Sequence, residues 1–370
     1  MGSRVTRMDN ANKFKLGMFA FNCSGGLTMT KAPEHWDASW DNNLRVAQAA
    51  DEAGIEFLLP LGRWLGHFGE TNTQETNFET LTWASGLLAA TKGITAFGTL
   101  HVSLIHPVFA AKQIVTADHI GKGRFGLNMV AGWNELEFGM FGKDLLEHDE
   151  RYAYAEEWMT IAKRIWSEDK QFDFKGKYFD LRRVLGKPKP YGGGRPLLMS
   201  AGSSPAGRAF AARNVDCLFM VIYDVDRLAQ DIADLRALAG RRVGVFASSH
   251  LIARATRREA EEYHHYIVHE MGDWEGAEYM MSVRVSGGSL STPPDRIRQL
   301  KERYISGSGT FPVLGSYDDA AATYKRLSDA GLDGLAVALV NYIDEFPRLR
   351  DEVLPRMERL GLRAPMKAYA

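Results

Sequence analysis

Residues 95–130 read TAFGTLHVSLIHPVFAAKQIVTADHIGKGRFGLNMV, and this stretch decides the fold that the sequence predicts. Its two ends, Thr95–Thr99 and Arg124–Val130, are expected to be buried strands, and Pro107–Ile120 between them is expected to be a helix. Two strands that are joined through a helix lie parallel in one sheet. The stretch is therefore one strand–helix–strand unit of a parallel sheet.

The same alternation continues on both sides of this unit. Upstream, the apolar run Phe14–Phe21 predicts a first strand that opens into the turn-rich loop Asn22–Gly26. The other predicted strands are Phe57–Pro60, Leu197–Ser200, Asp216–Phe219, Val243–Ile252 and Gly334–Leu339. The other predicted helices are Trp40–Ala53, Leu81–Thr91, Arg151–Trp166, Ser204–Arg213, Val225–Ala239 and Tyr317–Ala330, with a hairpin at Phe172–Leu181.

The eight predicted strands indicate a closed (β/α)8 TIM barrel rather than an open doubly wound sheet. The Gly-x-Gly-x-x-Gly pattern of dinucleotide-binding sheets does not follow the first strand, which disfavours that alternative further. Residues 1–13 are expected to be an N-terminal tail or a cloning remnant, and residues 14–370 a single barrel domain. Residues 259–308 interrupt the alternation, so we expect them to form an insertion that serves as a lid or an interface.

The composition narrows the classes of function. The chain has 45 Lys and Arg against 46 Asp and Glu, so no broad positive field favours nucleic acid or an anionic membrane surface. Its two cysteines, Cys23 and Cys217, are far apart and suggest neither a disulfide framework nor a metal site. No stretch reaches the apolar length of a membrane span. We expect a cytoplasmic protein whose partner is a small molecule.

Ser203 and Ser204 follow a predicted strand and open a predicted helix, where free backbone N–H groups and the helix dipole favour a phosphate. Arg151 and Tyr152 would add a cation and a hydroxyl to the same anion. Each has an ordinary alternative. Ser204 before Pro205 is also a plain helix cap, and a loop arginine is more often part of a surface ion pair.

Polar side chains also stand near the ends of two predicted strands, where the active sites of such barrels lie. Asn128 carries an amide able to donate and accept hydrogen bonds to a bound ligand, and Thr99 adds a hydroxyl. Trp133 is a candidate wall for a planar ligand. The alternatives are that Asn128 and Thr99 only satisfy neighbouring backbone groups and that Trp133 is packing. The histidines His101, His106 and His148 are weaker candidates for proton transfer.

Four stretches together resemble the bacterial-luciferase-like, flavin-dependent monooxygenase family. They are DHIGKGRFGLNMVAGW at residues 118–133, LEHDERY at 146–152, AGSSPAG at 201–207 and GSYDDAAATYKRLSDAGLDG at 315–334. Ser24–Leu27 and the pair Gly132–Trp133 are most similar to the pyrimidine and dimethylsulfone monooxygenase branches of that family. The resemblance extends over nearly the whole chain.

The resemblance implies a two-component monooxygenase that uses dioxygen and reduced FMN, with the FMN supplied by a separate NADH- or NADPH-dependent flavin reductase. Flavin contacts of the pyrimidine branch fall on Gly62, Arg63, Asn128, Glu137, Arg151, Tyr152 and Ser204. That branch also places a threonine, an asparagine and a tryptophan around the flavin N5 and oxygen, and these match Thr99, Asn128 and Trp133. This set implies a flavin-N5-bound peroxide as the oxidant. Relatives form homodimers or homotetramers.

The sequence departs from the pyrimidine branch after the second strand. Arg63 stands where that branch has a lysine, and the neighbouring residues Trp64, Leu65 and His67 differ as well. A guanidinium does not replace an ammonium group, so uracil is disfavoured as the substrate. Heterocyclic amides, sulfones and halogenated aromatics stay open. Two other functions also stay open: an F420-dependent oxidoreductase of the same superfamily and a non-catalytic flavin-binding protein.

Overall fold

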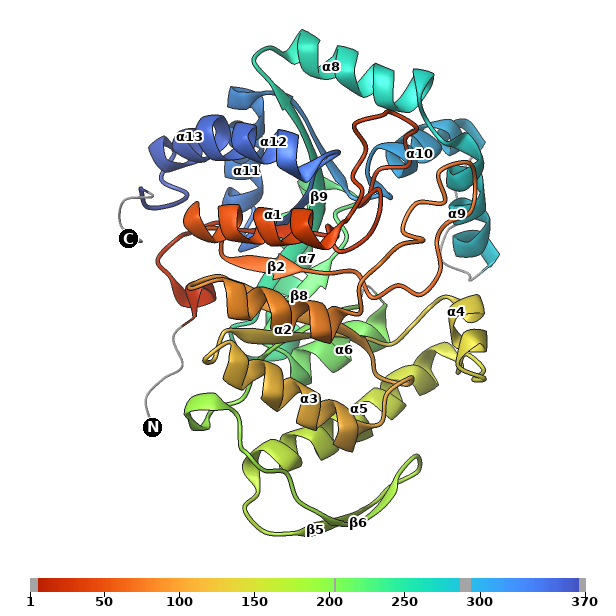
Figure 1. The fold of residues 1–370 in the computed structure, drawn as a ribbon, viewed down its shortest axis with the longest axis vertical. Helices are drawn as coiled ribbons and strands as arrows, with labels where there is room; N and C mark the ends of the chain where they lie inside the picture. Colours follow the sequence, from red (N-terminus) through yellow and green to blue (C-terminus); the bar gives the residue numbers. More distant parts are fainter. Residues whose placement is uncertain (1–5, 203, 287–293, 366–370) are drawn as a thin grey trace.

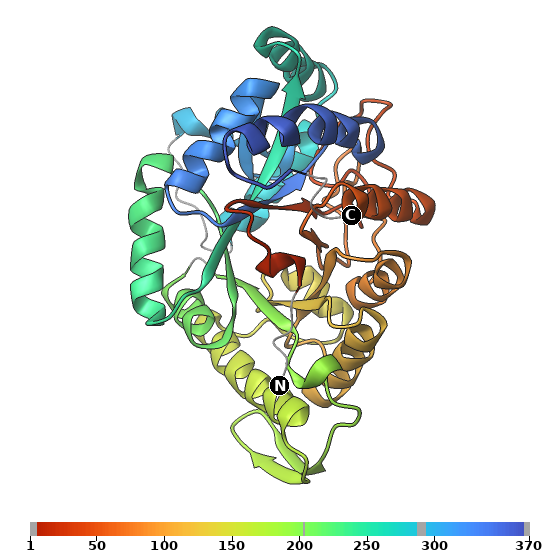
Figure 2. The same ribbon diagram turned by 90° about the vertical axis from the view of Figure 1, so that its left-hand side faces the viewer.

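The computed structural model describes residues 6–202, 204–286 and 294–365. Eight parallel strands close into a barrel in the order β1, β2, β3, β4, β7, β8, β9, β11 and back to β1. These strands are β1 (Lys15–Phe19), β2 (Phe57–Leu59), β3 (Thr95–His101), β4 (Phe125–Val130), β7 (Leu197–Ala201), β8 (Cys217–Met220), β9 (Gly244–Arg254) and β11 (Gly334–Ala338). The predicted TIM barrel is confirmed, and Figure 2 shows it end on.

Helices surround the barrel, and each predicted helix is present. They are α1 (Trp40–Glu52), α2 (Thr80–Ala90), α3 (Pro107–Ile120), α5 (His148–Ser167), α6 (Pro205–Asn214), α7 (Val225–Ala239) and α11 (Tyr317–Asp329). Their starts follow from local chemistry. The Ser316 hydroxyl accepts from the Asp319 N–H while the Asp319 carboxylate accepts from the Ser316 N–H, a capping box that fixes the first turn of α11.

Several elements were not expected from the sequence. A short helix, α4 (Glu135–Met140), occupies the loop after β4, and the Asn134 side chain caps it by accepting from the Leu136 N–H. A ninth parallel strand, β10 (Phe311–Ser316), pairs with the second half of β9 outside the barrel.

The hairpin of β5 (Phe172–Lys175) and β6 (Asp180–Val184) is antiparallel, as predicted. The last described elements are α12 (Tyr342–Arg348), a π-helical turn (Leu349–Val353) and α13 (Leu354–Arg359).

The region predicted as an insertion is helical. It contains most of α8 (Arg257–His265), the π-helical turn Tyr266–Glu270, α9 (Trp274–Ser286) and α10 (Pro294–Gly307). Figure 1 shows α9 and α10 beside the long loops that follow β1 and β2, at the end of the barrel where the strands finish. Among the described helices of the protein, none is long and apolar enough to cross a membrane.

Aromatic rings fill the middle of the barrel. Phe57 meets Phe97 and Phe246 edge to face, with ring centroids 6.0 and 5.7 Å apart. Glycines on neighbouring strands leave room for them, because a Cβ at Gly17 would lie 2.2 Å from the Phe57 ring and one at Gly126 would lie 2.4 Å from the Phe97 ring. Large and small residues thus alternate around one inner layer, as a packed barrel core requires.

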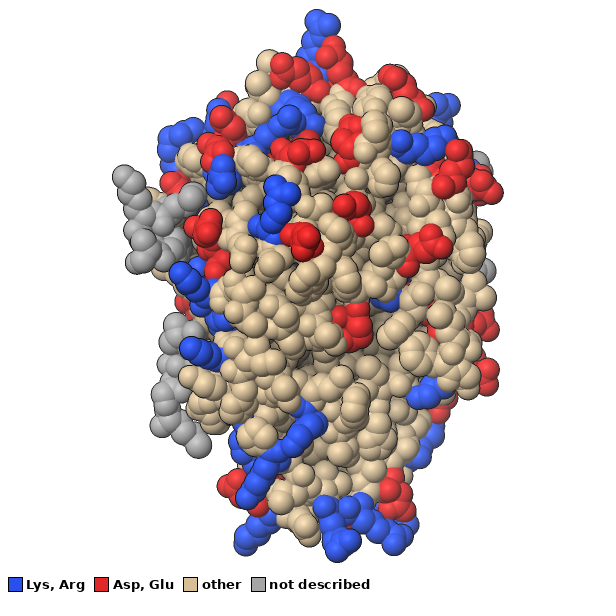
Figure 3. All heavy atoms as spheres, viewed as in Figure 1, with Lys and Arg blue, Asp and Glu red and all other residues tan. Residues whose placement is uncertain are grey.

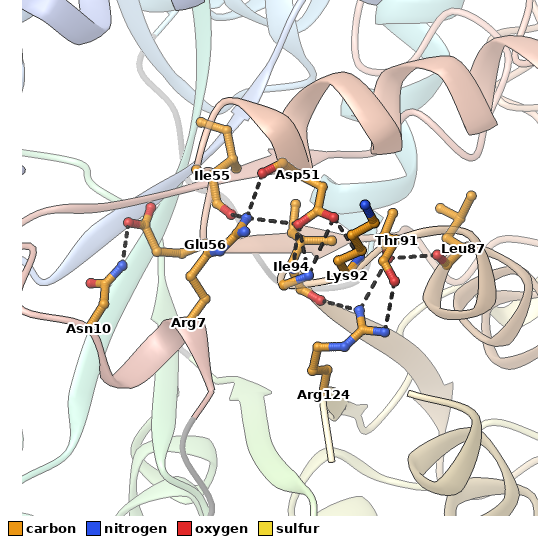
Figure 4. Close-up of polar contacts among 12 residues, drawn as sticks. Arg7, Asn10, Asp51, Ile55, Glu56, Leu87, Thr91, Lys92, Ile94 and Arg124 are labelled. Atoms are coloured by element: carbon orange, nitrogen blue, oxygen red, sulfur yellow. Dashed lines mark hydrogen bonds and ion pairs between the residues drawn. The ribbon is translucent and has the colours of Figure 1, made fainter. Parts of the chain in front are cut away.

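Polar contacts close the opposite end of the barrel, where the strands begin (Figure 4). Asp51 on α1 accepts hydrogen bonds from the backbone N–H groups of residues 92–94 and pairs with Arg7 at 2.9 Å. Glu56 and Arg363 form an ion pair of 3.1 Å in which both side chains are almost fully buried. These contacts anchor segments near both termini to the barrel.

Candidate active site

Asn128 and Thr99 point into the barrel one layer above the aromatic core. Side chains on a strand alternate between two faces, so Thr99 follows Phe97 inward and Asn128 shares the inward face of Gly126. The two residues are directly opposite each other in the register of β3 and β4. Both side chains are buried, and both lie toward the carboxyl ends of their strands, where barrel active sites form.

A short chain of hydrogen bonds connects these residues. The Thr99 hydroxyl donates to the Pro60 carbonyl oxygen at 2.6 Å, and the Asn128 Nδ2 donates to the Thr99 hydroxyl at 3.1 Å. Asn128 Oδ1 is buried and accepts no hydrogen bond from any residue that the structure describes. Thr99 thus satisfies a backbone carbonyl and also binds Asn128, and one acceptor of Asn128 is left unused by the described residues.

The loop after β2 brings Arg63 to the same end of the barrel. Its guanidinium lies 3.4 Å from the Glu137 carboxylate of α4, and both side chains are at most 5% exposed. Glu137 also accepts from the backbone N–H groups of Trp64 and Leu65. The half-exposed Trp133 ring lies against the Arg63 guanidinium, 5.1 Å from centroid to carbon, in a cation–π contact. Glu137 thus fixes this loop and neutralises Arg63.

A small pocket opens between this loop, β3 and the start of α2. Its lining residues are Gly62, Arg63, Trp64, Phe78, Glu79, Thr80, Leu81, Thr99, Leu100, His101, Leu104 and Ile105. Burial and the nearby Arg63 charge lower the pKa of His101 to about 4, so its imidazole is neutral at physiological pH. A Cβ at Gly62 would lie 3.2 Å from both Thr99 and His101. Glycine at position 62 therefore keeps the loop in close contact with these two residues.

Two of the residues expected to bind a phosphate, Tyr152 and Ser204, meet at the start of α6. A Cβ on Gly207 would lie 2.6 Å from the Tyr152 hydroxyl, so the two residues are in direct contact. The Ser204 hydroxyl accepts from the Gly207 N–H at 3.1 Å, which makes Ser204 a true helix cap. Arg151, the neighbour of Tyr152, donates to the Gly132 carbonyl oxygen, and its buried Nε has no partner within the described part of the chain. Ser203 lies outside the described residues.

Of the two remaining histidine candidates, His148 lies beside this site, with its ring centroid 5.4 Å from that of Tyr152, whereas His106 is placed at the start of α3. His106 caps α3 by accepting from the Val108 N–H, and the exposed His148 pairs with Asp149. By contrast, the contact between Asp273 and Thr71 escaped the sequence reasoning. The Asp273 carboxylate accepts from the Thr71 N–H at 2.8 Å and from its hydroxyl at 2.7 Å, which ties the insertion to the loop after β2. Nothing in the local sequence signals a contact between residues so far apart.

Comparison with known proteins identifies the family. The chain belongs to the luciferase-like monooxygenase family, whose model matches residues 14–336. It is 29% identical, over 95% of its length and 96% of the relative, to the FMNH2-dependent dimethylsulfone monooxygenase of Pseudomonas fluorescens (strain Pf0-1). It is 31% identical to the pyrimidine monooxygenase RutA of Bradyrhizobium sp. (strain BTAi1 / ATCC BAA-1182), over 66% of this chain and 69% of that protein. The predicted resemblance to a family of flavin-dependent monooxygenases is confirmed.

Solved structures support the same fold. A crystal structure of riboflavin lyase with modified FMN and its substrate riboflavin superposes with a TM-score of 0.83, covering 95% of this chain and 92% of that one. The sequence identity in this comparison is 22%, so the likeness concerns the barrel and its surrounding helices.

Proposed function

We propose that this protein is a two-component monooxygenase that uses reduced FMN and dioxygen to oxidise a small, uncharged organic molecule. The observation that carries the proposal is the barrel mouth, where the unused acceptor of Asn128, the neutralised pair Arg63 and Glu137 and the capped start of α6 lie at one end of the barrel. The family and its FMNH2-dependent relative support the cofactor.

The residues at the mouth fit FMN. The start of α6, with the Tyr152 hydroxyl against Gly207, offers a helix N-terminus and a hydroxyl, and the preceding residue Arg151 carries a cation whose Nε is buried and has no partner in the described part of the chain; these are groups that hold a phosphate. The buried Oδ1 of Asn128 offers an acceptor to a ring N–H. Tyr152 and Arg151 would thus hold the phosphate end, and Asn128 the ring. When bound, reduced FMN supplies the electrons that activate dioxygen.

The pocket beside Thr99 indicates the kind of substrate. Most of its lining is apolar or aromatic, and its charged members are compensated: Arg63 by Glu137, and Glu79 by the two N–H groups that it caps at the start of α2. A charged substrate would lose its hydration there without gaining a free counter-charge. Sulfones, heterocyclic amides and halogenated aromatics meet this requirement, and the dimethylsulfone relative favours the first class.

Two partners belong to the proposal. A separate NAD(P)H-dependent flavin reductase supplies reduced FMN, and a second copy of the chain forms a homodimer or homotetramer. Helix α2 carries no charged residue, and the face on which it lies is largely free of charge at its centre (Figure 3). Exposed Phe109 at the start of the adjacent helix α3 adds apolar surface. Such a face favours association between copies.

The test is a coupled assay with isotopically labelled dioxygen. Purified protein is mixed with FMN, NADH, a generic flavin reductase and a panel of the three substrate classes, and products are read by mass spectrometry. One labelled oxygen atom per product molecule, dependent on both FMN and reductase, is the expected result. Product without labelled oxygen, formed with reduced F420, would instead support the F420-dependent alternative. Tight FMN binding without any product would support the flavin-binding alternative.

A further inference from the structure

A cavity of about 190 Å³ lies outside the barrel wall, between β8 and the neighbouring helices α6 and α7. The Phe219 ring of β8 contacts the Phe19 ring of β1, with centroids 5.8 Å apart. Because β8 and β1 are not adjacent in the sheet, Phe219 must point into the barrel. Leu218 and Met220 alternate with it along the strand and therefore point outward, into the cavity. The strand itself separates this cavity from the barrel interior.

The cavity has an apolar floor and a charged rim. Its floor consists of Leu218, Met220 and Leu235, each of which is at most 8% exposed. Arg208 of α6 and Asp231 of α7 lie at the rim, and both are half-buried. A cation and an anion thus flank one apolar surface, each carried by a different helix.

Neither charge is compensated within the described part of the chain. Arg208 and Asp231 form no ion pair and no side-chain hydrogen bond with each other or with another described residue, although both line one cavity. Arg208 is also separate from the proposed phosphate site. Its neighbour Gly207 contacts Tyr152 on the side of α6 that faces α5, whereas Arg208 lies on the side that faces α7. A ligand with two opposite charges would satisfy both groups.

We propose that this cavity binds a small zwitterion of the amino-acid class, with its carboxylate at Arg208 and its ammonium group at Asp231. A guanidinium matches a carboxylate in geometry as well as in charge. Pockets for drug-sized ligands measure roughly 300–1,000 Å³, so a cavity of 190 Å³ admits only a smaller molecule. The apolar floor would take the side chain, and the ring of Tyr223 at the edge of the cavity favours an aromatic one.

The first experiment is calorimetric titration of the purified protein with L-phenylalanine as the probe. We expect saturable binding of one molecule per chain. Phenethylamine lacks the carboxylate and 3-phenylpropionate lacks the ammonium group, so each should bind about tenfold more weakly, the effect of one hydrogen-bonded charged group. These two compounds keep the aromatic ring and separate the charges from apolar binding.

Two variants assign each charge to its residue. Arg208→Gln should lower the affinity for L-phenylalanine about tenfold and leave that for phenethylamine unchanged. Asp231→Asn should lower the affinity for L-phenylalanine to a similar extent and leave that for 3-phenylpropionate unchanged. The control is Asp234→Asn on the same helix, because Asp234 is exposed, accepts from Gln230 and does not line the cavity. It should bind all three compounds as the wild type does.

NMR of methionine methyl groups locates the bound ligand. The Met220 signal should shift when L-phenylalanine is added, whereas that of Met199 on β7, which does not line the cavity, should stay in place. Absence of saturable binding at millimolar L-phenylalanine would overturn the inference. Binding that both Arg208→Gln and Asp231→Asn leave unchanged would overturn it as well. Neither result bears on the proposed function, because the cavity lies outside the barrel.

Discussion

The Glu137 carboxylate lies 3.4 Å from the Arg63 guanidinium, and together the two side chains link α4 to the loop after β2. Glu137 makes two more contacts with this loop, through the N–H groups of Trp64 and Leu65. A flavin-contacting role had been predicted for Glu137 from the family resemblance. In the structure Glu137 holds the loop that carries Arg63, and its flavin contact stays a prediction.

Replacing Glu137 should therefore destabilise the protein and weaken cofactor binding together. Glu137→Ala leaves the Arg63 charge buried without a counter-charge, which costs about 3 kcal/mol of unfolding free energy. Glu137→Gln keeps an oxygen for the two loop N–H groups and should lose about half as much. Urea unfolding measures the loss of stability in both variants. The exposed Glu135 on the same helix is the control: if Glu135→Ala costs as much as Glu137→Ala, the assigned role is wrong.

Gly207→Ala tests the phosphate end of the site. Alanine normally stabilises a helix by about 1 kcal/mol relative to glycine, but here its methyl group would lie 2.6 Å from the Tyr152 hydroxyl. Overpacking of this kind costs about 1–3 kcal/mol. Because it displaces Tyr152, we expect FMN affinity to fall about tenfold. Affinity for riboflavin, which has no phosphate, should be unchanged.

The control for this substitution is Gly139→Ala in α4, where an added Cβ has no neighbour within 4 Å. Fluorescence titration with FMN and with riboflavin separates the two cases. Equal losses for both ligands in Gly207→Ala would show that the damage is general and would contradict a phosphate site at α6.

His101 should make stability depend on pH. Burial and Arg63 lower the pKa of its imidazole to about 4 in the folded state, whereas the unfolded chain titrates near 6.5. Between these values the unfolded state binds more protons, so the contribution of His101 is fully present above pH 6.5 and is lost as the pH falls toward 4. The loss amounts to about 3 kcal/mol at most.

His101→Asn removes this titration. The difference in unfolding free energy between wild type and variant should shrink by about 2 kcal/mol, or change sign, between pH 8 and pH 5. Denaturant unfolding at the two pH values measures it, and the pH 8 data of the same variant report the loss of packing alone. A difference that is independent of pH would contradict a neutral, buried imidazole.

The contact between Asp273 and Thr71 predicts how the insertion is held. Burial alone would raise the pKa of Asp273, but hydrogen bonds from the backbone of Gly276 and from Thr71 lower it below its ordinary value. A charged, buried acceptor with several donors is a strong anchor. Asp273→Ala should increase amide hydrogen exchange in α9 by at least about tenfold.

If the insertion serves as a lid, one of the two roles that the sequence predicts for it, the same substitution should also release more hydrogen peroxide per FMNH2 consumed, because water reaches the site more easily. The control is Asp224→Ala, which removes the cap of α7 and costs about 1 kcal/mol without touching the insertion. Faster exchange in α7 but not in α9 is expected for that control. Unchanged exchange in α9 of Asp273→Ala would contradict the anchor.

Local sequence patterns predicted most of the barrel but missed elements that depend on remote contacts. The bounds of α3 and α7 match their predicted ranges, because caps and apolar periodicity lie within each segment. The sequence patterns did not predict helix α4. Its one large buried anchor, Phe138, packs near His101 and over Gly132, and a six-residue helix is stable only with such support. Strand β10 exists because β9 extends beyond the barrel.

The sequence by itself determined the alternation of strands and helices, the candidate residues at the strand ends and the family. Each of these depends on residue types and spacings along the chain. Only the tertiary structure decided which polar atoms are already used. The Thr99 proton belongs to Pro60, the Arg63 charge to Glu137, and Asn128 Oδ1 to no residue in the described part of the chain. Hydrogen bonds and charges are satisfied by neighbours in space, and barrel closure sets those neighbours.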